Sequence, residues 1–465
     1  MTPEPVASLL REHFDVIPVA PGPTAAELRA RAAAPEPASG RRRPPPWRSA
    51  LLAVAAAAAA VVAVLAVAVL PGLGDHGSTG AAGPRVDDGV TLPRKLPGLS
   101  FLTAKVSQAP PGRAIAVFRQ GAWGTRWGTT QVIVLGVDGR TYRRLDVAEE
   151  RGNWAADGEW SAAPVLLAPD GLSAAVADPT RVTSTIDVVD LTTGQSHPYR
   201  LDPPAAVSPL AWSPTGRSLI YAVLDGPSED GQGPAGLAVL DIDSGRSRRV
   251  SESLPDGVGS AAPTAGSKVI VAGDPPGCPM RVFDLTDGDG PRDLPAGSDC
   301  AGGARVVPAP ADGTDPGGAR EDRVVVEEQN ERLRKTARLL DIADPDAALP
   351  EPVDIGSENW LVGWRPGGML VTTSDGFVEI PTDGAPQRVL TRFSESGSGS
   401  VYDWQVAANL VPDAVVSRTG VDRGPWPWWW RITLSSVLVS VFLVWLIARR
   451  RRSRRAVVDA SRMPD

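Results

Sequence analysis

The chain contains few of the residue types on which many active and metal sites depend. Its 465 residues include three His, two Cys and four Lys, and aromatic residues make up 5%. The His residues are far apart and neither Cys belongs to a Cys-x-x-Cys motif, so the sequence predicts no metal site. It also contains no Gly-x-Ser-x-Gly motif, which argues against a serine hydrolase built on that turn. We therefore predict no catalytic residue and no cofactor.

Negative charge is concentrated in the middle of the chain. Residues 1–48 carry a net +2 and residues 431–465 a net +6, so the total of −7 leaves −15 on residues 71–430. Because binding to phosphate requires a basic face, we predict no nucleic-acid partner for this middle part. The basic residues are nearly all Arg, which is typical of a high-GC (actinobacterial-type) bacterial genome.

Two long uncharged runs predict membrane-spanning helices. The first, residues 49–70, has 22 residues, and the second, residues 432–448, has 17 residues and is more apolar. At about 1.5 Å per residue the first is long enough to cross a hydrocarbon core of about 30 Å. The second run directly follows a tryptophan cluster, which is typical of a membrane–water interface. The cluster consists of Trp426, Trp428, Trp429 and Trp430.

Arginine clusters flank the two runs on the sides that face the chain termini. Arg41, Arg42, Arg43 and Arg48 precede the first run, and six Arg residues between 449 and 455 follow the second. Since positive flanks stay inside, we predict a two-pass protein of the cell membrane with both termini in the cytoplasm. An alternative is that the first run is a signal peptide, cleaved after residues 66–68 (Ala-Val-Ala).

Two interleaved series of turns and apolar strands repeat six times between the runs. In the first series a Pro–Gly turn precedes a strand, and the intervals between successive turns are 58, 45, 49, 47 and 56 residues. Its strands are 114–118, 173–177, 218–223, 268–272, 323–326 and 369–372. The second series places an apolar strand before a turn that is mostly acidic and Gly-containing, at 132–137, 186–191, 237–242, 281–285, 337–342 and 376–380. Units of this length that cannot bury an apolar face alone predict a propeller.

Two stretches resemble a known class of repeat. Leu-Ala-Trp-Ser-Pro-Thr-Gly at 210–216 and Val-Val-Asp-Leu-Thr-Thr-Gly at 188–194 are similar to repeats of TolB-like and WD-repeat-like propellers. The resemblance covers about residues 105–395 and implies an all-β fold of six four-stranded blades, without implying a function. The expected domains are a cytoplasmic tail (1–48), a helix (49–70), a linker (71–98), an extracytoplasmic propeller (99–412), a second linker (413–430), a second helix (431–448) and a basic tail (449–465).

A few residues of this outer domain are candidates for specific roles. Cys278 and Cys300 are an even pair expected outside the cytoplasm, which favours a disulfide over free buried thiols. Trp212 and Trp364 share one position in the repeat and are expected to pack between blades. Four tryptophans that do not share this position form either a ligand face or local packing: Trp123, Trp127, Trp154 and Trp160.

Three functions remain open from the sequence. The first is a non-enzymatic binding, scaffold or sensing module that contacts the lipid bilayer and an envelope protein, peptide or glycan. The second is an envelope enzyme of the lyase, lactonase or glycosidase type, with its site on the central propeller face. In the third, the tails carry the function and the outer domain acts as a spacer.

Overall fold

The computed structural model describes the central part of the chain and a few residues near its C-terminal end. The described ranges are 89–121, 130–154, 160–161, 163–227, 235–254, 258, 260–264, 266–273, 279–286, 290–294, 304–308, 323–329, 334–342, 344, 351–357, 359–382, 384–393 and 400–425, with ten helical residues between 433 and 447. The chain divides into two compact units, 64–445 and 1–63 with 446–465, and every described strand belongs to the first. No helix within the described ranges is long and apolar enough to span a bilayer.

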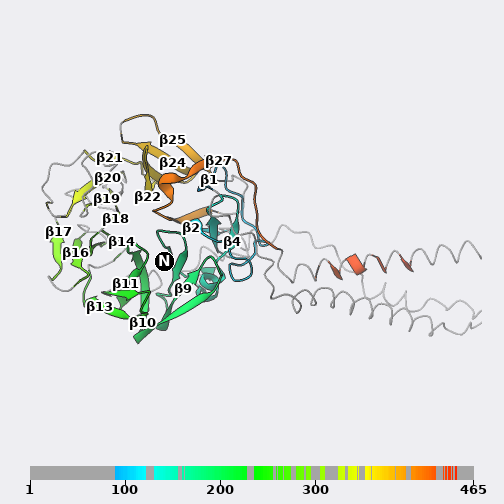
Figure 1. Ribbon diagram of the computed structural model, residues 1–465, viewed down its shortest axis with the longest axis horizontal. Helices are drawn as coiled ribbons and strands as arrows, with labels where there is room; N and C mark the ends of the chain where they lie inside the picture. The colour runs from blue at the N-terminus through cyan, green and yellow to red at the C-terminus, as the bar shows by residue number, and fades with distance from the viewer. Residues whose placement is uncertain are drawn as a thin grey trace, which may run out of the picture. The chain divides into compact units, whose positions relative to one another are not determined.

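Antiparallel sheets make up this unit and lie around a ring (Figure 1). All twelve strands predicted from the two repeat series are present, and the two strands of each repeat pair with each other in an antiparallel meander. They are β2 (Ala114–Gly121), β3 (Gln131–Gly136), β8 (Ser173–Val176), β9 (Thr183–Asp190), β11 (Ser218–Leu224), β12 (Ala235–Asp241), β15 (Lys268–Ala272), β16 (Met280–Asp284), β19 (Arg323–Gln329), β20 (Lys335–Asp341), β23 (Gly368–Thr373) and β24 (Gly376–Pro381). The arrangement is a β-propeller, which confirms the predicted all-β fold class.

Shorter strands complete the meanders on their inner and outer sides. Four sheets of the described chain are separate and four-stranded, in the orders β26-β2-β3-β4, β14-β15-β16-β17, β18-β19-β20-β21 and β22-β23-β24-β25. The flanking strands are β4 (Tyr142–Arg144), β14 (Ser260–Pro263), β17 (Arg292–Leu294), β18 (Ala304–Pro308), β21 (Val353–Asp354), β22 (Trp360–Arg365), β25 (Arg388–Arg392) and β26 (Ser400–Val406).

A fifth, seven-stranded sheet joins the second and third units of the repeat, which were expected to be separate. Its order is β13-β12-β11-β10-β9-β8-β7, with β7 at Val165–Leu167, β10 at Ser196–Trp212 and β13 at Ser247–Ser251. The first part of β10 pairs with β9, and the part from Ala206 to Trp212 pairs with β11. Between them the chain contains Pro203 and Pro204 and no Gly. Because proline favours extended backbone, this connection stays extended and β10 continues through it.

The Pro–Gly turns of the repeat contact the neighbouring sheet. Gly171, in the turn before β8, has φ +73°, and its carbonyl accepts a hydrogen bond of 2.7 Å from the Ala114 amide of β2. A Cβ atom at position 171 would lie 2.0 Å from the Ala114 carbonyl oxygen. Glycine is therefore required at this turn both by its conformation and by the close approach of the adjacent strand.

Trp212 and Trp364 pack between neighbouring units of the repeat, as their common repeat position predicted. The Trp212 indole N–H, at the end of β10, donates to the Leu166 carbonyl of β7 at 3.1 Å. The Trp364 indole N–H donates in the same way to the Pro308 carbonyl of β18 at 3.0 Å. Each indole thus connects its own strand to the inner strand of the preceding unit.

Strand β26, which follows the last four-stranded sheet in the chain, closes the ring by pairing with β2 in the first sheet. Trp404 of β26 is 4% exposed and packs among aromatic side chains from the first and last sheets. Its ring stacks on Phe118 at 4.2 Å and on Phe393 at 5.1 Å between centroids, and meets Phe377 edge-on at 4.5 Å. Aromatic burial of this kind is among the largest contributions a side chain makes to a core.

Candidate functional site

The predicted tryptophan face is only partly described by the structure. Trp154 and Trp160 pair across a small two-stranded sheet, β5 (Asn153–Trp154) and β6 (Trp160–Ser161), in the connection between β4 and β7. Several predicted residues lie outside the described ranges, namely Trp123, Trp127, Cys278, Cys300, Trp426, Trp428, Trp429 and Trp430. The ligand face and the disulfide therefore stay predictions.

The segments that enter and leave the ring lie side by side. Strand β1 (Thr91–Pro93) pairs in parallel with β27 (Val415–Ser417), although both lie in segments that the sequence indicated as linkers. Further along, the Ala104 amide donates to the Arg423 carbonyl at 2.8 Å. The two ends of the ring are thus held together over most of their described length.

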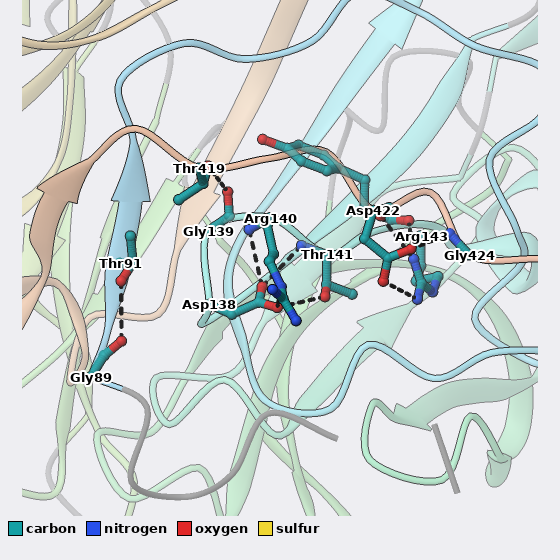
Figure 2. A network of polar contacts seen from close by, with 11 residues as sticks. Gly89, Thr91, Asp138, Gly139, Arg140, Thr141, Arg143, Thr419, Asp422 and Gly424 are labelled. Carbon is teal, nitrogen blue, oxygen red and sulfur yellow. Dashed lines mark hydrogen bonds and ion pairs between the residues drawn. The ribbon is translucent and has the colours of Figure 1, made fainter. Parts of the chain in front are cut away.

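Both segments also bind the turn between β3 and β4, and Figure 2 shows the contacts of the C-terminal segment with it. We call residues 89–91, 138–143 and 419–424 the terminal clasp. The Thr91 amide donates to the Val137 carbonyl at 2.8 Å, and the Thr419 hydroxyl donates to the Gly139 carbonyl at 2.8 Å. The Asp138 carboxylate shapes the turn by accepting from the Thr141 amide at 2.9 Å and from its hydroxyl at 2.7 Å. One turn of the first sheet therefore binds both ends.

A buried arginine is the centre of the clasp. Arg143 is 4% exposed, and its guanidinium donates to the Ala109 carbonyl at 2.8 Å, to the Asp422 carbonyl at 3.0 Å and to the Asp422 carboxylate at 3.1 Å. Burial alone would raise the pKa of the Asp422 carboxyl, but the Gly424 amide and Arg143 outweigh it and lower that pKa below its ordinary value. The charged form of Asp422 therefore stabilises the clasp.

A second polar cluster lies inside the sheet β18–β21 and beside β22. The Lys335 ammonium and the Glu327 carboxylate are 3.6 Å apart, and their side chains are only 4% and 2% exposed. Glu327 also accepts from the Leu361 amide of β22 at 3.0 Å, and Lys335 donates to the Asn359 carbonyl at 3.2 Å. Burial raises the pKa of Glu327 and lowers the pKa of Lys335, because both charged forms lose hydration.

Trp360, the first residue of β22, covers this ion pair. The Lys335 ammonium lies 2.8 Å from the centroid of the indole ring, and the Arg305 guanidinium carbon of β18 lies 5.9 Å from it. Trp360 is nevertheless 44% exposed, which is unusual for a large aromatic residue on an inner strand. We call Arg305, Glu327, Lys335 and Trp360 the inner-strand site. It combines an exposed ring with buried charge, the combination that ligand sites often have.

Sequence reasoning did not find the inner-strand site. Lys335 is one of four lysines, but a lysine in an alternating strand gives no signal that it is buried. Glu327 lies in the pattern Val-Val-Val-Glu-Glu-Gln, where the alternation does not say which glutamate faces inward. The signal that was available is Trp360 itself, an aromatic residue four positions before the repeat tryptophan Trp364.

The two carboxyl groups with a raised pKa belong to different parts of the ring. Glu149 lies on the short helix α4 (Asp146–Arg151) after the first sheet and is bonded to Arg144, and burial raises its pKa. Glu327 lies on β19. Inner strands β7 and β14 carry no ionisable side chain. Within the described part of the chain, the acids with a raised pKa do not converge on one central site.

Comparisons with known proteins give similarities to solved structures alone. No family model and no curated protein matches the chain. TolB from Acinetobacter baumannii has 15% identity and a TM-score of 0.40, with 64% of this chain and 68% of that chain covered. An oligogalacturonate lyase in complex with manganese has 13% identity, 62% and 78% coverage, and a TM-score of 0.37. The β-propeller domain of the trilobed protease from Pyrococcus furiosus has 12% identity, 60% and 82% coverage, and a TM-score of 0.35. The propeller assignment itself rests on the strand pairing described above.

Proposed function

We infer that this chain is a membrane-anchored, extracytoplasmic β-propeller that acts as a non-enzymatic binding, scaffold or sensing module. The observation that carries the proposal is the parallel pairing of β1 with β27 and the terminal clasp around it. A ring whose two ends emerge together suits a chain with an apolar run beyond each end, at 49–70 and 432–448. Two neighbouring helices in a bilayer require such an arrangement, and the arginine clusters favour cytoplasmic termini.

Six blades are the natural count for this ring. The seven-stranded sheet divides where β10 changes its partner, because β10 pairs with β9 up to Ala205 and with β11 from Ala206. Each part of β10 then completes a four-stranded meander, one with β7, β8 and β9 and the other with β11, β12 and β13. With the four separate sheets, these two meanders agree with the six repeats of the sequence.

A partner in the cell envelope, either a protein, a peptide or a glycan, is the expected ligand. The inner-strand site offers an exposed indole beside positive charge, which suits recognition more directly than proton transfer. The enzyme alternative needs acids that converge on the central face. The separation of Glu149 from Glu327 gives that alternative no support within the described residues.

The topology is tested by protease accessibility in intact cells stripped of their wall. An epitope tag is inserted after Asp225, an exposed position that follows β11, in one version of the full chain. Control versions carry the same tag at residue 2 or after residue 465. We expect added protease to remove the Asp225 tag and to leave both terminal tags intact until the membrane is permeabilised. Protection of the Asp225 tag in intact cells contradicts the proposal.

The expected disulfide gives an independent check of the same compartment. Cys278 and Cys300 are the only cysteines, so the purified chain without reductant should contain no free thiol if they are bonded. Thiol titration under denaturing conditions, before and after reduction, is expected to rise from none to two per chain. Two free thiols before reduction argue against an oxidising compartment.

A further inference from the structure

We propose that the inner-strand site binds the carboxylate group of an acidic ligand, with the ligand stacked on Trp360 and its charge at Arg305. The inference deepens the proposed function, on which it rests, by naming the chemistry of the ligand. It concerns a place that neither the repeat pattern nor the predicted tryptophan face indicates. Three features support it: the alignment of β18 with β22, the charges between these strands, and the exposed face of the indole.

Strands β18 and β22 run side by side in the same direction. Near their ends, the Trp364 indole of β22 donates to the Pro308 carbonyl of β18 at 3.0 Å. At their starts, the Arg305 guanidinium of β18 lies 5.9 Å from the Trp360 ring of β22. The two contacts fix the alignment at both ends, so Arg305 and Trp360 are neighbours at one edge of the inner wall.

The charges of the site leave a net positive charge, because Glu327 is its one carboxylate and Lys335 and Arg305 are both cations. Lys335 and Glu327 form a pair at 3.6 Å, and Glu327 is additionally satisfied by the Leu361 amide. Arg305 is half-buried and lies opposite Glu327 where β18 pairs with β19, so this one carboxylate faces two cations. Other charged residues of the inner wall are paired, since Arg119 contacts Asp403 at 2.9 Å and Arg365 contacts Glu379 at 3.4 Å. An anion at Arg305 would therefore complete the site.

The indole accepts a partner on one side only, because a cation lies against its ring. The Lys335 ammonium, 2.8 Å from the ring centroid, attracts the π electrons toward the protein. The Arg305 guanidinium also lies close to the ring, 5.9 Å from its centroid, so a carboxylate that binds Arg305 lies beside an indole flanked by two cations. Arginine can bind a carboxylate through two parallel N–H donors, which orients it as well as attracting it.

The buried ion pair has a positioning role in this arrangement. A buried pair contributes little net stability compared with apolar residues of the same size, so its presence calls for another reason. Here the pair holds Lys335 under the indole and, through the Leu361 amide, fixes the start of β22. Arg305 and Trp360 are then the residues that touch the ligand.

Ligand-observed saturation-transfer NMR with the purified full chain in detergent tests the proposal. The probes are N-acetyl-L-glutamate, which represents an acidic peptide side chain, and D-glucuronate, which represents a sugar acid. Their neutral partners are N-acetyl-L-glutamine and D-glucose. We expect one acid to bind at least about 10-fold more tightly than its neutral partner, and the acid that binds identifies the source of the carboxylate.

Variants decide whether binding occurs at this site. Arg305→Gln is expected to remove the preference for the acid, and Trp360→Ala to weaken binding of the acid probe. Arg388→Gln, an exposed arginine of β25 beside Glu379, is the matched control and is expected to leave the preference unchanged. If the preference for the acid falls with added salt, and Arg388→Gln reduces it as much as Arg305→Gln does, the proposal is overturned.

Two further outcomes of the binding experiment also decide whether a carboxylate site is present. Failure of both acids to bind the wild-type chain, or equal binding of acid and neutral probes, overturns the carboxylate site. An unfolding curve that matches the wild type shows that a variant is folded. Arg305→Lys keeps the positive charge and should retain part of the preference for the acid. If the tag at Asp225 is protected while acid binding persists, the proposed localisation fails and the site remains.

Discussion

The ring closure and the sheet β18–β21 are stabilised by different physics. At the closure, Phe118, Phe377, Phe393 and Trp404 pack against one another. In the sheet β18–β21 the aliphatic core surrounds an ion pair whose two side chains are almost completely buried. The first region buries apolar area, which stabilises a fold directly. The second buries charge, which costs free energy unless the geometry compensates.

The difference indicates that the ring closure serves the stability of the fold, whereas the ion pair in the sheet β18–β21 serves another purpose. Closing a ring of sheets needs strong packing at one place, because the first and last strands are far apart in the sequence and must meet. An ion pair under a half-exposed indole adds little to closure or to packing. We therefore expect substitutions at the closure to change the free energy of unfolding most. At the inner-strand site, we expect that replacing both buried charges costs little stability, so that ligand binding rather than stability accounts for the ion pair.

The largest effect is expected from Trp404→Ala. Loss of this side chain leaves a cavity among Phe118, Phe377 and Phe393, so the free energy of unfolding should fall by about 3–5 kcal/mol. Urea unfolding of the purified full chain, followed by tryptophan fluorescence, measures the change. Phe101→Ala is the control, because Phe101 is 49% exposed and its loss should cost less than about 1 kcal/mol. If both variants lose a similar amount of unfolding free energy, the packing around Trp404 does not stabilise the ring closure more than an exposed side chain does.

Lys335→Met should cost about 3 kcal/mol at pH 7, because it leaves the buried Glu327 carboxylate without its cation. The double variant Glu327→Gln, Lys335→Met removes both charges and should recover most of that loss. Burial already raises the pKa of Glu327, so its protonated form is favoured in the folded state. The single variant should therefore regain stability as the pH falls through the raised pKa of Glu327, and the gain should be complete below the ordinary glutamate pKa of about 4.3. A pH-independent loss, or a double variant no better than the single one, contradicts this account.

Asp422→Asn should have a smaller effect, of about 1 kcal/mol or less, because half of the Asp422 side chain is exposed and solvent screens its charge. Since the pKa of Asp422 is lowered, its contribution is present above the ordinary aspartate pKa of about 4 and is lost as the pH falls through the folded value. Hydrogen exchange at the Tyr142 amide, which donates to the Asp422 carbonyl, reports on the clasp locally.

A matched control for the clasp is Asp243→Asn. Asp243 pairs with Arg217 at 3.8 Å, and both side chains are highly exposed, so no measurable change is expected. Faster exchange at Tyr142 in Asp422→Asn but not in Asp243→Asn supports the clasp. Equal exchange in the two variants argues that the contact between Arg143 and Asp422 does not hold the ends of the ring.

The repeats made the main strands predictable, since turn residues and alternating apolar residues are local signals. Every strand predicted from Pro–Gly turns, such as Lys268–Ala272, appears in the structure. The merging of two units through β10 was not predicted, because the register of two distant strand pairs decides it. Strands β1 and β27 were assigned to linkers, since three-residue strands carry no periodic pattern and form only when their partner is present.

The inner-strand site was not predictable for a similar reason. Burial of Glu327 and Lys335 depends on which face of the sheet packs against β22, and neither residue lies in a motif. Trp123 and Trp127 were chosen as ligand residues because they lie off the repeat position, yet Trp360 also lies off it and was not chosen. Deviation from a repeat is therefore a useful signal only when the neighbouring strand is known.

Oxidative cross-linking of the full chain tests most directly whether the two ends of the ring lie side by side. Thr91 and Val415 are paired residues of β1 and β27, and Val415 is 63% exposed. In a chain with Cys278→Ala and Cys300→Ala, we expect Thr91→Cys and Val415→Cys to form a disulfide readily. Thr91→Cys with Val182→Cys, an exposed position in the β8–β9 turn, should not react. Equal cross-linking of the two pairs, or none of the Thr91–Val415 pair, would contradict the account.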